Sequence, residues 1–398
     1  MTSPTNGPMQ GIRVLDLGSM IAGPGAAGIL ADQGADVIKV EPPGIGDVMR
    51  YFGACRGGVS GLFQNSNRGK RSLALDLKSA DAQKIIHRLI PQVDIVLHNF
   101  RSGVSERLGI DYDSLKAVNP ELIYLWVNGF GAQGPMAKNA AFDNVIQAFA
   151  GVAQSQSDEQ SGEPIQYYQL FSDKLTALTG AQALSAALFA RAQGRGGQFI
   201  NLSMVDSVVS FLWADVAGTS TFLEDGAQVG LKLGRNKLME FTDGWGTIAP
   251  VTDAQFHGIC AAFGVDSSAP ELATAMERNG HPELLEQTFN KLRAVARELS
   301  ADEAMTSMEA ADVPCAKAMF LSDLPEHPQM QINHSFVETD HPQAGRMVEP
   351  RNPARFSSTP SGVGAPCAAL GQHSDEILLE LGYDSEAIEQ LRGSGAVG

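Results

Sequence analysis

The chain is short of cysteine and of long apolar runs, and both shortages exclude classes of protein. Only four cysteines occur in 398 residues (Cys55, Cys260, Cys315 and Cys367), far apart and without a CxxC pair or a Cys/His metal spacing. We therefore expect reduced thiols and no metal site. No run of about 18 uncharged apolar residues is present, and the polar beginning MTSPTNGPMQ lacks the apolar core of a signal peptide. The sequence thus predicts a soluble, cytoplasmic protein with no membrane partner.

Positive charge is scarce as well. Lys and Arg number 29 against 45 Asp and Glu, which gives a formal net charge of −16. This balance argues against nucleic acid or an anionic membrane surface as the main partner. A small anionic ligand remains compatible with it, because the binding of such a ligand depends on local charge. The composition is otherwise globular, with 43% hydrophobic residues, and the length allows more than one domain.

The first 130 residues alternate between two kinds of segment. Apolar, β-branched stretches predict strands, and small or amphipathic stretches between them predict helices. This alternation is typical of an α/β domain with a doubly wound parallel sheet, in which ligands bind at the carboxyl ends of the strands. The turn after the first strand reads GSMIAGPGAAG (18–28) and lacks the GxGxxG fingerprint, which argues against a nicotinamide dinucleotide. The predicted strands are 11–18, 35–41, 72–77, 93–100 and 121–130, and the predicted helices are 22–34 and 78–92.

The remaining chain changes character twice. A long helical pattern covers 172–198, and from 199 to 320 apolar and turn-rich pieces predict a second, smaller α+β domain. The tail from 320 to 398 has proline-rich loops and then a last pair of helices.

Two short stretches hold a concentration of basic residues. NRGKRSLALDLK (67–78) flanks the predicted third strand, and FRSGVSERLG (100–109) follows the fourth. This density of cations suits a pyrophosphate together with a phosphomonoester. The alternative is a solvated basic edge that offsets acidic neighbours, and charge alone leaves both interpretations open. The residues concerned are Arg68, Lys70, Arg71, Lys78, Arg101 and Arg107.

Asp173 stands at the beginning of the longest helical pattern, 172–198. The plain interpretation is that Ser172 and Asp173 cap the helix by accepting N–H groups of its first turn. The functional interpretation uses the same position. A helix N-terminus favours an ionised carboxylate, and a carboxylate can be the covalent nucleophile toward an activated acyl group.

These segments together resemble a known family, the class III coenzyme A transferases. The family includes formyl-CoA:oxalate, carnitine and bile-acid CoA-transferases, and α-methylacyl-CoA racemase is a relative. The similarity covers nearly the whole chain in the same order. It is carried by GIRVLDLGSMIAGPGAAGILADQGADVIKVEPPGIGD (11–47), NRGKRSLALDLK (67–78), VDIVLHNFRSGVSERLGIDYDSL (93–115), NPELIYLWVNGFGAQGP (119–135), FDNVIQAFAG (142–151), SDKLTALTGAQALSAALFARAQGRGGQ (172–198) and LGQHSDEILLELGY (370–383).

The resemblance implies a set of site residues. Asp173 matches the catalytic nucleophile of the family. Coenzyme A is implied as part of a substrate, not as a permanently bound cofactor, and no metal is implied. The CoA-contacting positions fall on Ile21, Ala22, Leu75, Asp76, Leu77, Lys78, Asn99, Phe100, Arg101, Arg107, Ala140, Ala141, Phe142 and Asp143.

The resemblance also implies an architecture. A large Rossmann-like CoA-binding domain would consist of residues 1–205, which carry Asp173, and of a C-terminal return, 321–398. A small α+β domain would comprise 206–320. Two such protomers, each an open ring, would interlock into a homodimer.

The implied activity moves CoA from an acyl-CoA donor to a carboxylic acid acceptor, through mixed anhydrides and an aspartyl-CoA thioester on Asp173. Two alternatives remain: an acyl-CoA racemase or isomerase that transfers an α-proton, and a non-catalytic CoA-binding protein. Against the racemase, its histidine base is replaced here by Phe142. Against formyl-CoA and oxalate, Ile21 and Pro42 replace a glutamine and an arginine of that enzyme, and its glycine-tetrad loop is absent.

Three residues of the predicted small domain can be interpreted in two ways. Arg235, Lys237 and Trp245 either border the substrate cavity or form a solvated turn over a packed aromatic ring. An apolar Ile21 beside the acyl site points to a larger or less polar acyl group. The sequence names neither donor nor acceptor.

Overall fold

A computed structural model describes residues 7–158, 160–228 and 238–398 of the chain. The chain forms two compact units: unit 1 comprises Met1–Ala217 and Gln329–Gly398, and unit 2 comprises Gly218–Pro328. The boundaries expected from the sequence, 205/206 and 320/321, lie 12 and 8 residues earlier. The assignment of CoA binding to the larger unit remains a prediction.

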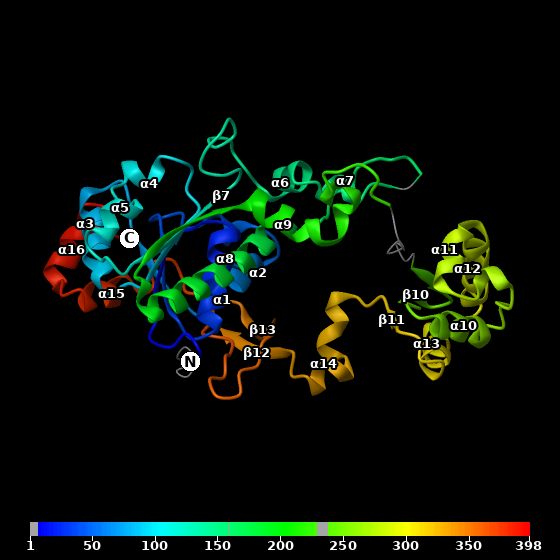
Figure 1. The fold of residues 1–398 in the computed structure, drawn as a ribbon. Helices are drawn as coiled ribbons and strands as arrows, with labels where there is room; N and C mark the ends of the chain where they lie inside the picture. The colour runs from blue at the N-terminus through cyan, green and yellow to red at the C-terminus, as the bar shows by residue number, and fades with distance from the viewer. Residues whose placement is uncertain (1–6, 159, 229–237) are drawn as a thin grey trace. The chain divides into compact units, whose positions relative to one another are not determined.

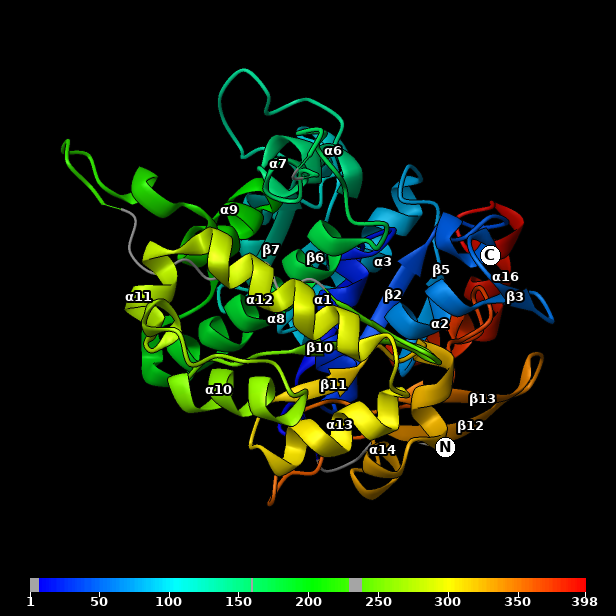
Figure 2. The ribbon, with the colours of Figure 1, turned by 90° about the vertical axis from the view of Figure 1, so that its right-hand side faces the viewer.

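Unit 1 is built on a six-stranded parallel sheet, seen in Figure 2, with strand order β5-β2-β1-β6-β7-β8. Counted along the chain these strands run 3-2-1-4-5-6, the order of doubly wound nucleotide-binding sheets. The order reverses between β1 and β6, which makes their carboxyl ends the expected ligand position. The predicted α/β class is confirmed. The strands are β1 (Arg13–Asp16), β2 (Asp36–Glu41), β5 (Lys70–Ala74), β6 (Ile95–His98), β7 (Ile123–Asn128) and β8 (Gln198–Ser203).

Helices cover both faces of this sheet, so the central strands are buried on both sides and mostly apolar, with buried charged side chains at Asp16, Lys39 and Glu41. One core includes Leu15, Ile38, Leu73 and Val96, and the other includes Val14, Val37 and Ile95. In Figure 1 the C-terminal helices, drawn in red, lie beside helices from the first third of the chain. The first face carries α3 (Ala80–Leu89), α5 (Tyr112–Lys116), α15 (Ser374–Glu380) and α16 (Ser385–Gly393), and the second carries α1 (Ala22–Asp32), α6 (Asp143–Phe149), α7 (Val152–Ser155), α8 (Phe171–Ala190) and α9 (Met204–Val216).

Small residues let α1 and α8 approach closely. A Cβ added to Gly25 in α1 would lie 2.9 Å from the Cβ of Ala177 in α8, and one added to Gly180 would lie 3.3 Å from that of Ala26. Only residues without a bulky side chain fit there. This packing holds the first turn of α8 beside the first turn of α1.

Some element ends differ from those predicted. β5 spans 70–74, not 72–77. The helical pattern reaches residue 198, yet α8 ends at Ala190 and continues only as a five-residue π-helical segment, Arg191–Arg195, in which Gly194 has a φ of 78°. The left-handed conformation of Gly194 ends the helix. Gln198–Ser203 then becomes the sixth strand of the main sheet, so the second domain does not begin at 199.

Shorter elements complete unit 1. A hairpin of β12 and β13 from the C-terminal part of the chain was not predicted from the sequence. These elements are β3 (Cys55–Arg56), β4 (Val59–Ser60), α2 (Gly61–Asn67), α4 (Val104–Arg107), β12 (Phe336–His341) and β13 (Gly345–Pro350), with α14 (Pro328–Ile332) at the junction of the two units.

Unit 2 combines helices with an antiparallel sheet of order β11-β10-β9. Three of its helices begin with a reciprocal capping box, made by Thr252 with Gln255, Thr274 with Glu277, and Ser300 with Glu303. Its elements are β9 (Met239–Phe241), β10 (Gly244–Ile248), α10 (Asp253–Ala262), α11 (Ala275–Gly280), α12 (Pro282–Ala296), α13 (Ala301–Ala310) and β11 (Cys315–Lys317).

Of the three residues of unit 2 that the sequence places either at the substrate cavity or in a solvated turn, only Trp245 lies among the described residues. Trp245 lies half-exposed on β10, and its reach to the substrate remains a prediction. Arg235 and Lys237 lie outside the described residues.

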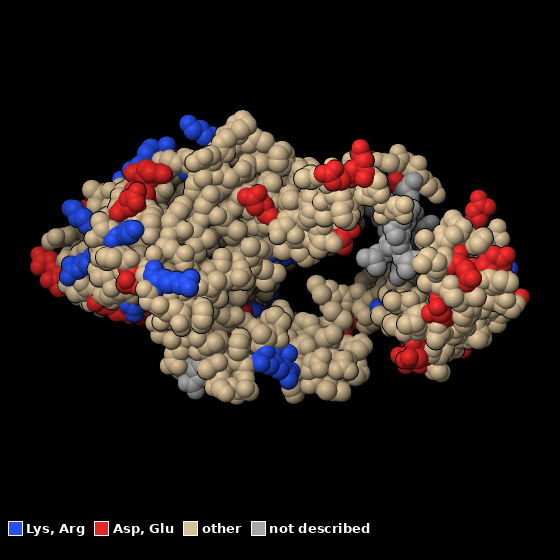
Figure 3. All heavy atoms as spheres, in the orientation of Figure 1, with Lys and Arg blue, Asp and Glu red and all other residues tan. Residues whose placement is uncertain are grey.

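Basic and acidic side chains intermingle on the face of unit 1 shown in Figure 3, and they do not gather there into one basic field. Among the described residues, no helix has both the length and the apolar character needed to cross a membrane. Within the same ranges, no group of three or more His, Cys, Asp or Glu residues is placed to hold a metal ion.

Candidate active site

A cavity of about 310 Å³ opens at the carboxyl edge of the sheet, at the switch point between β1 and β6. Its walls come from the segments that follow β1, β6, β7 and β8 and from the first turn of α8. Asp173 is its acidic residue, and Arg101 and Lys138 are its basic residues. The lining consists of Ser19, Met20, Ala22, Asn99, Phe100, Arg101, Ser102, Val127, Asn128, Gly129, Ala137, Lys138, Asn139, Ala141, Phe142, Asp173 and Met204.

Asp173 is the third residue of α8 and does not cap it. The helix begins after Leu170, whose side chain makes no capping bond. The backbone N–H of Asp173 donates to Oδ1 of Asp143 at 2.9 Å. Its own carboxylate has no hydrogen bond or ion pair within the described part of the chain. The capping interpretation of Asp173 is therefore wrong, and its carboxylate is free on the cavity wall.

Burial and a neighbouring charge make this carboxyl unusually basic. Desolvation is the larger cause and the negative charge of Asp143 is the smaller one, and together they raise the pKa of Asp173 to about 7. A carboxylate with a higher pKa is a stronger nucleophile once ionised. The site thus holds a carboxylate whose pKa is raised and which has no partner among the described residues.

The loop after β1 is fixed on two sides. Ser19 donates its N–H to Oδ1 of Asn99 at 2.9 Å, and Nδ2 of Asn99 donates to the Ser19 carbonyl at 2.8 Å. Met20 has a φ of 65°, a strained value for a residue with a side chain, and donates to Asp47. The backbone of this loop therefore holds a fixed conformation at the cavity.

A buried lysine, Lys39, also holds the loop after β1. Nζ of Lys39 donates to the Gly18 carbonyl at 3.0 Å and pairs with Asp47 at 3.0 Å. Burial disfavours the charge on Lys39, but nearby carboxylates, chiefly those of Asp16 and Asp47, outweigh burial and raise its pKa. The lysine therefore stays charged and holds the loop.

Three of the clustered cations have structural roles. Arg68 pairs with Asp32 at 2.7 Å, and Lys70 pairs with Asp16 at 2.8 Å. Arg71 pairs with carboxylates on β2 and α15. For these three the phosphate interpretation is wrong, because their charges are already neutralised inside the unit.

The other cations, Lys78, Arg101 and Arg107, remain available. They are exposed, and none of them forms an ion pair with a described residue.

The structure brings part of the predicted site together. Ala22, Asn99, Phe100, Arg101, Ala141, Phe142 and Asp173 all line the cavity.

The other predicted positions lie around the cavity or behind it. Leu75, Asp76, Leu77 and Lys78 follow β5 at the same edge, where the Asp76 N–H donates to Ala396 near the chain end. Arg107 ends α4 and Ala140 lies on an exposed loop. Ile21 packs with Met49 and Phe63, and Asp143 is buried behind Asp173.

Sequence reasoning missed several residues of the cavity wall. All lie at the carboxyl ends of strands or in the segments that follow them, and the only sequence signal was that position. Gly129 shows how tight the wall is, because a Cβ there would lie 2.3 Å from the Cβ of Ala141. The missed residues are Ser19, Met20, Ser102, Val127, Asn128, Gly129, Ala137, Lys138, Asn139 and Met204.

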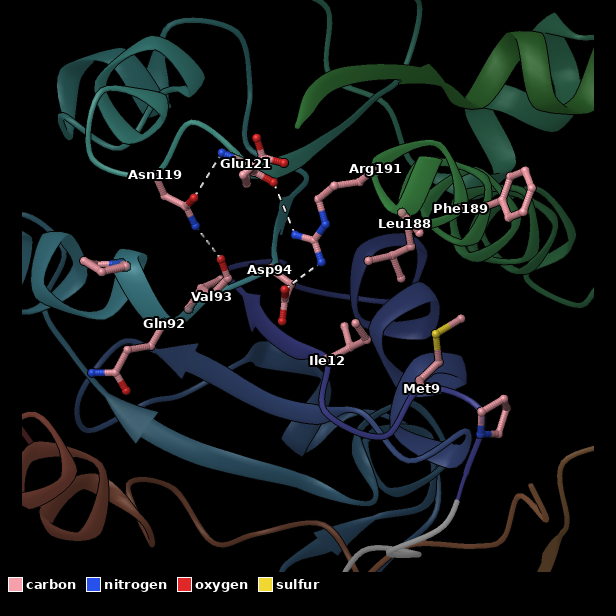
Figure 4. Close-up of a pocket in the computed structure, with 13 residues that line it drawn as sticks. Met9, Ile12, Gln92, Val93, Asp94, Asn119, Glu121, Leu188, Phe189 and Arg191 are labelled. Carbon is pink, nitrogen blue, oxygen red and sulfur yellow. Dashed lines mark hydrogen bonds and ion pairs between the residues drawn. The ribbon is translucent and has the colours of Figure 1, made fainter. Parts of the chain in front are cut away.

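A larger hollow of about 750 Å³ lies at the opposite, amino edge of the sheet (Figure 4). Its polar groups pair with one another. Arg191 binds Asp94 at 2.7 Å and the Glu121 carbonyl at 3.2 Å, and Asn119 donates to the Val93 carbonyl at 2.9 Å. The Glu121 carboxylate of the hollow is exposed, so the described lining residues include no partly buried, unpaired carboxylate like that of the smaller cavity.

Comparison with known proteins agrees with this geometry. A family model described as CoA-transferase family III matches residues 9–374. The chain belongs to CoA-transferase family III. It is a class III CoA-transferase, and CoA thioesters are the substrates of its family. The predicted family and enzyme class are confirmed.

Two curated relatives and one solved structure show how far the similarity extends. The succinyl-CoA–D-citramalate CoA-transferase of Chloroflexus aurantiacus is 30% identical over 94% of each chain. The succinate–glutarate CoA-transferase of Agrobacterium fabrum is 31% identical over 94% of this class III CoA-transferase and 96% of the relative. A CAIB/BAIF family protein from Brucella suis has a TM-score of 0.81 at 28% identity, over 94% of this chain and all of its own.

Proposed function

We propose that this class III CoA-transferase moves CoA from an acyl-CoA donor to a carboxylic acid through covalent intermediates on Asp173. The observation that carries the proposal is the free, unusually basic carboxylate of Asp173 on the wall of a cavity that also holds Arg101 and Lys138. A carboxylate in that setting can attack a thioester.

The reaction is a series of balanced acyl exchanges. An Asp173 oxygen attacks the donor carbonyl, and a new C–O bond replaces the C–S bond. CoA departs as the thiolate, and a mixed anhydride remains on Asp173. The thiolate then attacks Cγ of Asp173, which releases the donor acid and leaves an aspartyl-CoA thioester. The acceptor carboxylate attacks Cγ of that thioester, the C–S bond breaks, and a second anhydride forms as CoA thiolate is released. CoA thiolate finally attacks the acceptor acyl carbon, which frees Asp173 as a carboxylate with no net proton change.

The charged groups at the edge of the sheet suit the remainder of CoA. Arg101 and Lys138 line the cavity, and Lys78 and Arg107 lie along the same edge without an ion pair among described residues. Cations on a strand edge and uncapped helix starts favour phosphates. The α1 helix starts at the cavity without a side-chain cap. We therefore propose that the nucleotide of CoA lies along this edge of the sheet. The contacts predicted from the sequence lie at the same edge, at Ala22, Leu75–Lys78, Asn99–Arg101 and Arg107.

The relatives suggest where to begin with substrates. Their names specify succinyl-CoA or succinate with a second acid. We propose a dicarboxylic acyl donor, with succinyl-CoA as the first to test, and an organic acid acceptor. Phe142 lies on the cavity wall where a racemase would have its histidine base, which disfavours α-proton transfer.

We also propose that the active form is an interlocked homodimer. Unit 1 has large apolar side chains that are exposed to water in a single protomer, including Tyr168, Leu178 and Phe189. An interface over these residues fits the resemblance to the family.

The decisive experiment is intact-mass spectrometry after incubation with succinyl-CoA and a panel of other acyl-CoAs. Hydroxylamine or borohydride would trap anhydride and thioester intermediates. We expect a CoA adduct or trapped derivative at Asp173 in the wild type and none in Asp173→Ala. Deuterium entering the α-carbon of an acyl-CoA with no adduct would instead establish a racemase.

A further inference from the structure

The side-chain amide of Gln147 ties α6 to the segment that leads into α8. Gln147 is only 1% exposed. Its Nε2 donates to Oδ2 of Asp143 at 2.6 Å and to the carbonyls of Tyr167 and Gln169, each at 3.2 Å. Its Oε1 accepts the N–H of Tyr167 at 2.8 Å. One buried amide thus joins a carboxylate on its own helix to two residues just before Asp173.

Asp143 completes the connection to the nucleophile. It accepts from Gln147 through Oδ2 and from the backbone N–H of Asp173 through Oδ1. That N–H belongs to the first turn of α8, where helix donors have no partner of their own. Asp143 therefore caps α8 from another helix, and both of its oxygens have fixed partners.

We propose that Gln147 is a positioning residue for Asp173, acting through Asp143 to fix the first turn of α8 and the negative charge behind the nucleophile. Gln147 does not line the cavity, so its effect reaches the acyl group only through Asp143 and α8. The inference rests on the proposed function, in which the Asp173 carboxylate is the attacking group. A carboxylate displaced by about 1 Å can lose two orders of magnitude in rate.

The same arrangement makes the pH dependence of the reaction sensitive to residue 147. The charged groups around Asp173 are Asp143 on α6 and Arg101 and Lys138 on the cavity wall. The first turn of α9, which packs against α6 and α8, adds the exposed Asp206, and the first turn of α1 has no acidic residue. Of these groups, Asp143 raises the pKa of Asp173, second to burial. A second carboxylate at position 147 would add to its effect.

The test is the pH profile of kcat/KM with the donor that gives the Asp173 adduct. In Gln147→Glu the amide that donates to Asp143 and to the carbonyls of Tyr167 and Gln169 is replaced by a carboxyl group, which adds a like charge beside Asp143 once it ionises. We expect the acid limb to move up by about 0.5–1 pH unit, kcat to fall about ten-fold, and KM to stay within about two-fold. Gln154→Glu, an exposed glutamine on the neighbouring α7, adds the same charge and should leave the profile unchanged.

A charge-swapped double variant separates positioning from simple destabilisation. When Asp143→Asn is combined with Gln147→Glu, the amide now at position 143 can donate to the carboxylate at position 147 and still accept the N–H of Asp173. The carbonyls of Tyr167 and Gln169 lose their donor in both variants that carry Gln147→Glu, so rescue is partial. We expect a kcat above that of either single variant. A double variant no faster than the slower single variant would overturn the proposal.

Two outcomes distinguish this inference from the proposed function. If the wild type forms no Asp173 adduct with any donor, the proposed function fails. If the wild type forms the adduct and Gln147→Glu keeps its acid limb and kcat, the positioning role is wrong and the proposed function stands. Should Gln147→Glu not fold, Gln147→Met removes the hydrogen bonds without adding charge. Its kcat should fall at unchanged KM, and an unchanged kcat would equally overturn the inference.

Discussion

The single residue Asp173 combines partial burial with a carboxylate that has no partner among the described residues. In most proteins a carboxylate so placed is paired, because desolvation of an unpaired charge is unfavourable. Here burial and the charge of Asp143 raise its pKa to about 7 instead. Reactive groups are often held in such unfavourable settings, and function and stability then oppose each other at one side chain.

Replacement of Asp173 by Asn should therefore abolish transfer and stabilise the protein at neutral and alkaline pH. The pKa of Asp173 is about 7 when folded against a model value of 3.8, so the folded state binds the proton more tightly. The contribution of this carboxyl group to the free energy of unfolding is largest below pH 4, and it declines as the pH rises toward and through 7. An Asn side chain does not ionise, so the Asp173→Asn variant does not lose unfolding free energy in this way as the pH rises. We expect a gain on the order of 1–4 kcal/mol at pH 8 that shrinks toward pH 4.5, measured by urea unfolding.

The control for this prediction is Asp206→Asn, which removes an exposed carboxylate from the first turn of α9. That change should not stabilise the protein, because an acidic group is favourable at a helix start. If Asp173→Asn were no more stable than the wild type at pH 8, burial and the charge of Asp143 would not destabilise the ionised Asp173 carboxylate, and the prediction would be wrong.

Arg101 and Lys138 provide the second prediction at the residue scale. Both line the cavity, so Arg101→Ala and Lys138→Ala should each raise KM for the acyl-CoA about five- to twenty-fold, with little change in kcat. The KM of each variant should also depend less on salt, because one phosphate contact is lost. Steady-state kinetics at two ionic strengths provide the measurement. Lys84→Ala, an exposed lysine on α3, is the matched control, and an equal rise in its KM would contradict a specific contact.

At the scale of elements, the close approach of α1 and α8 determines the position of Asp173 relative to the loop after β1. Gly25 and Ala26 on α1 face Ala177 and Gly180 on α8, and no larger side chain fits between them. The loop after β1 leads into α1, and Asp173 lies in the first turn of α8. The spacing of the two helices therefore determines how far Asp173 stands from the loop that carries Met20.

Gly25→Ala should separate these helices and impair both stability and rate. Its Cβ would lie 2.9 Å from the Cβ of Ala177, so α8 must shift. We expect a loss of about 1–3 kcal/mol in unfolding free energy and a several-fold lower kcat. Gly393→Ala is the control, because a Cβ there meets nothing within 4 Å. Urea unfolding and kinetics of both variants provide the comparison, and equal behaviour of the two would exclude a role for the close packing.

The interiors of elements could be predicted from the sequence, but several of their ends could not. Buried strands such as 35–41 are marked by β-branched apolar residues, here Val37, Ile38 and Val40, and the parallel sheet follows from their alternation with helices. The helical pattern, by contrast, continues past Ala190, and only the left-handed Gly194 ends it. β8 was not assigned to the main sheet because it is an edge strand with exposed residues and a weak pattern.

The site was predictable where chemistry marks a residue and unpredictable where tertiary contacts decide. Asp173 was singled out by its residue type and its helix start. Lys138 was missed because only the path of a loop brings it to the cavity. Arg68 and Lys70 carry the same local charge signal as Arg101, yet they are neutralised by Asp32 and Asp16, which are distant in sequence. Pairing of this kind is invisible in a local pattern.

At the scale of the whole molecule, the proposed interlocked dimer makes a prediction that an ordinary dimer does not. Each protomer exposes large apolar side chains, including Leu178, Phe189 and Trp213, and we expect the partner to cover them. Two interlocked open rings cannot separate without unfolding, so dissociation and unfolding should be one event. Light scattering should give about 84 kDa, twice the 42.2 kDa of one chain, even at nanomolar concentration.

Subunit exchange then distinguishes interlocking from simple association. When two differently tagged preparations are mixed under native conditions, we expect no hybrid dimers over days, because interlocked protomers cannot separate while they are folded. Hybrids should form only after unfolding in urea and refolding together, which serves as the positive control. A mass of 42.2 kDa for the native protein would contradict the dimer itself. Hybrids that form within hours without denaturant would leave a dimer but rule out interlocking, because such exchange requires protomers that separate while folded.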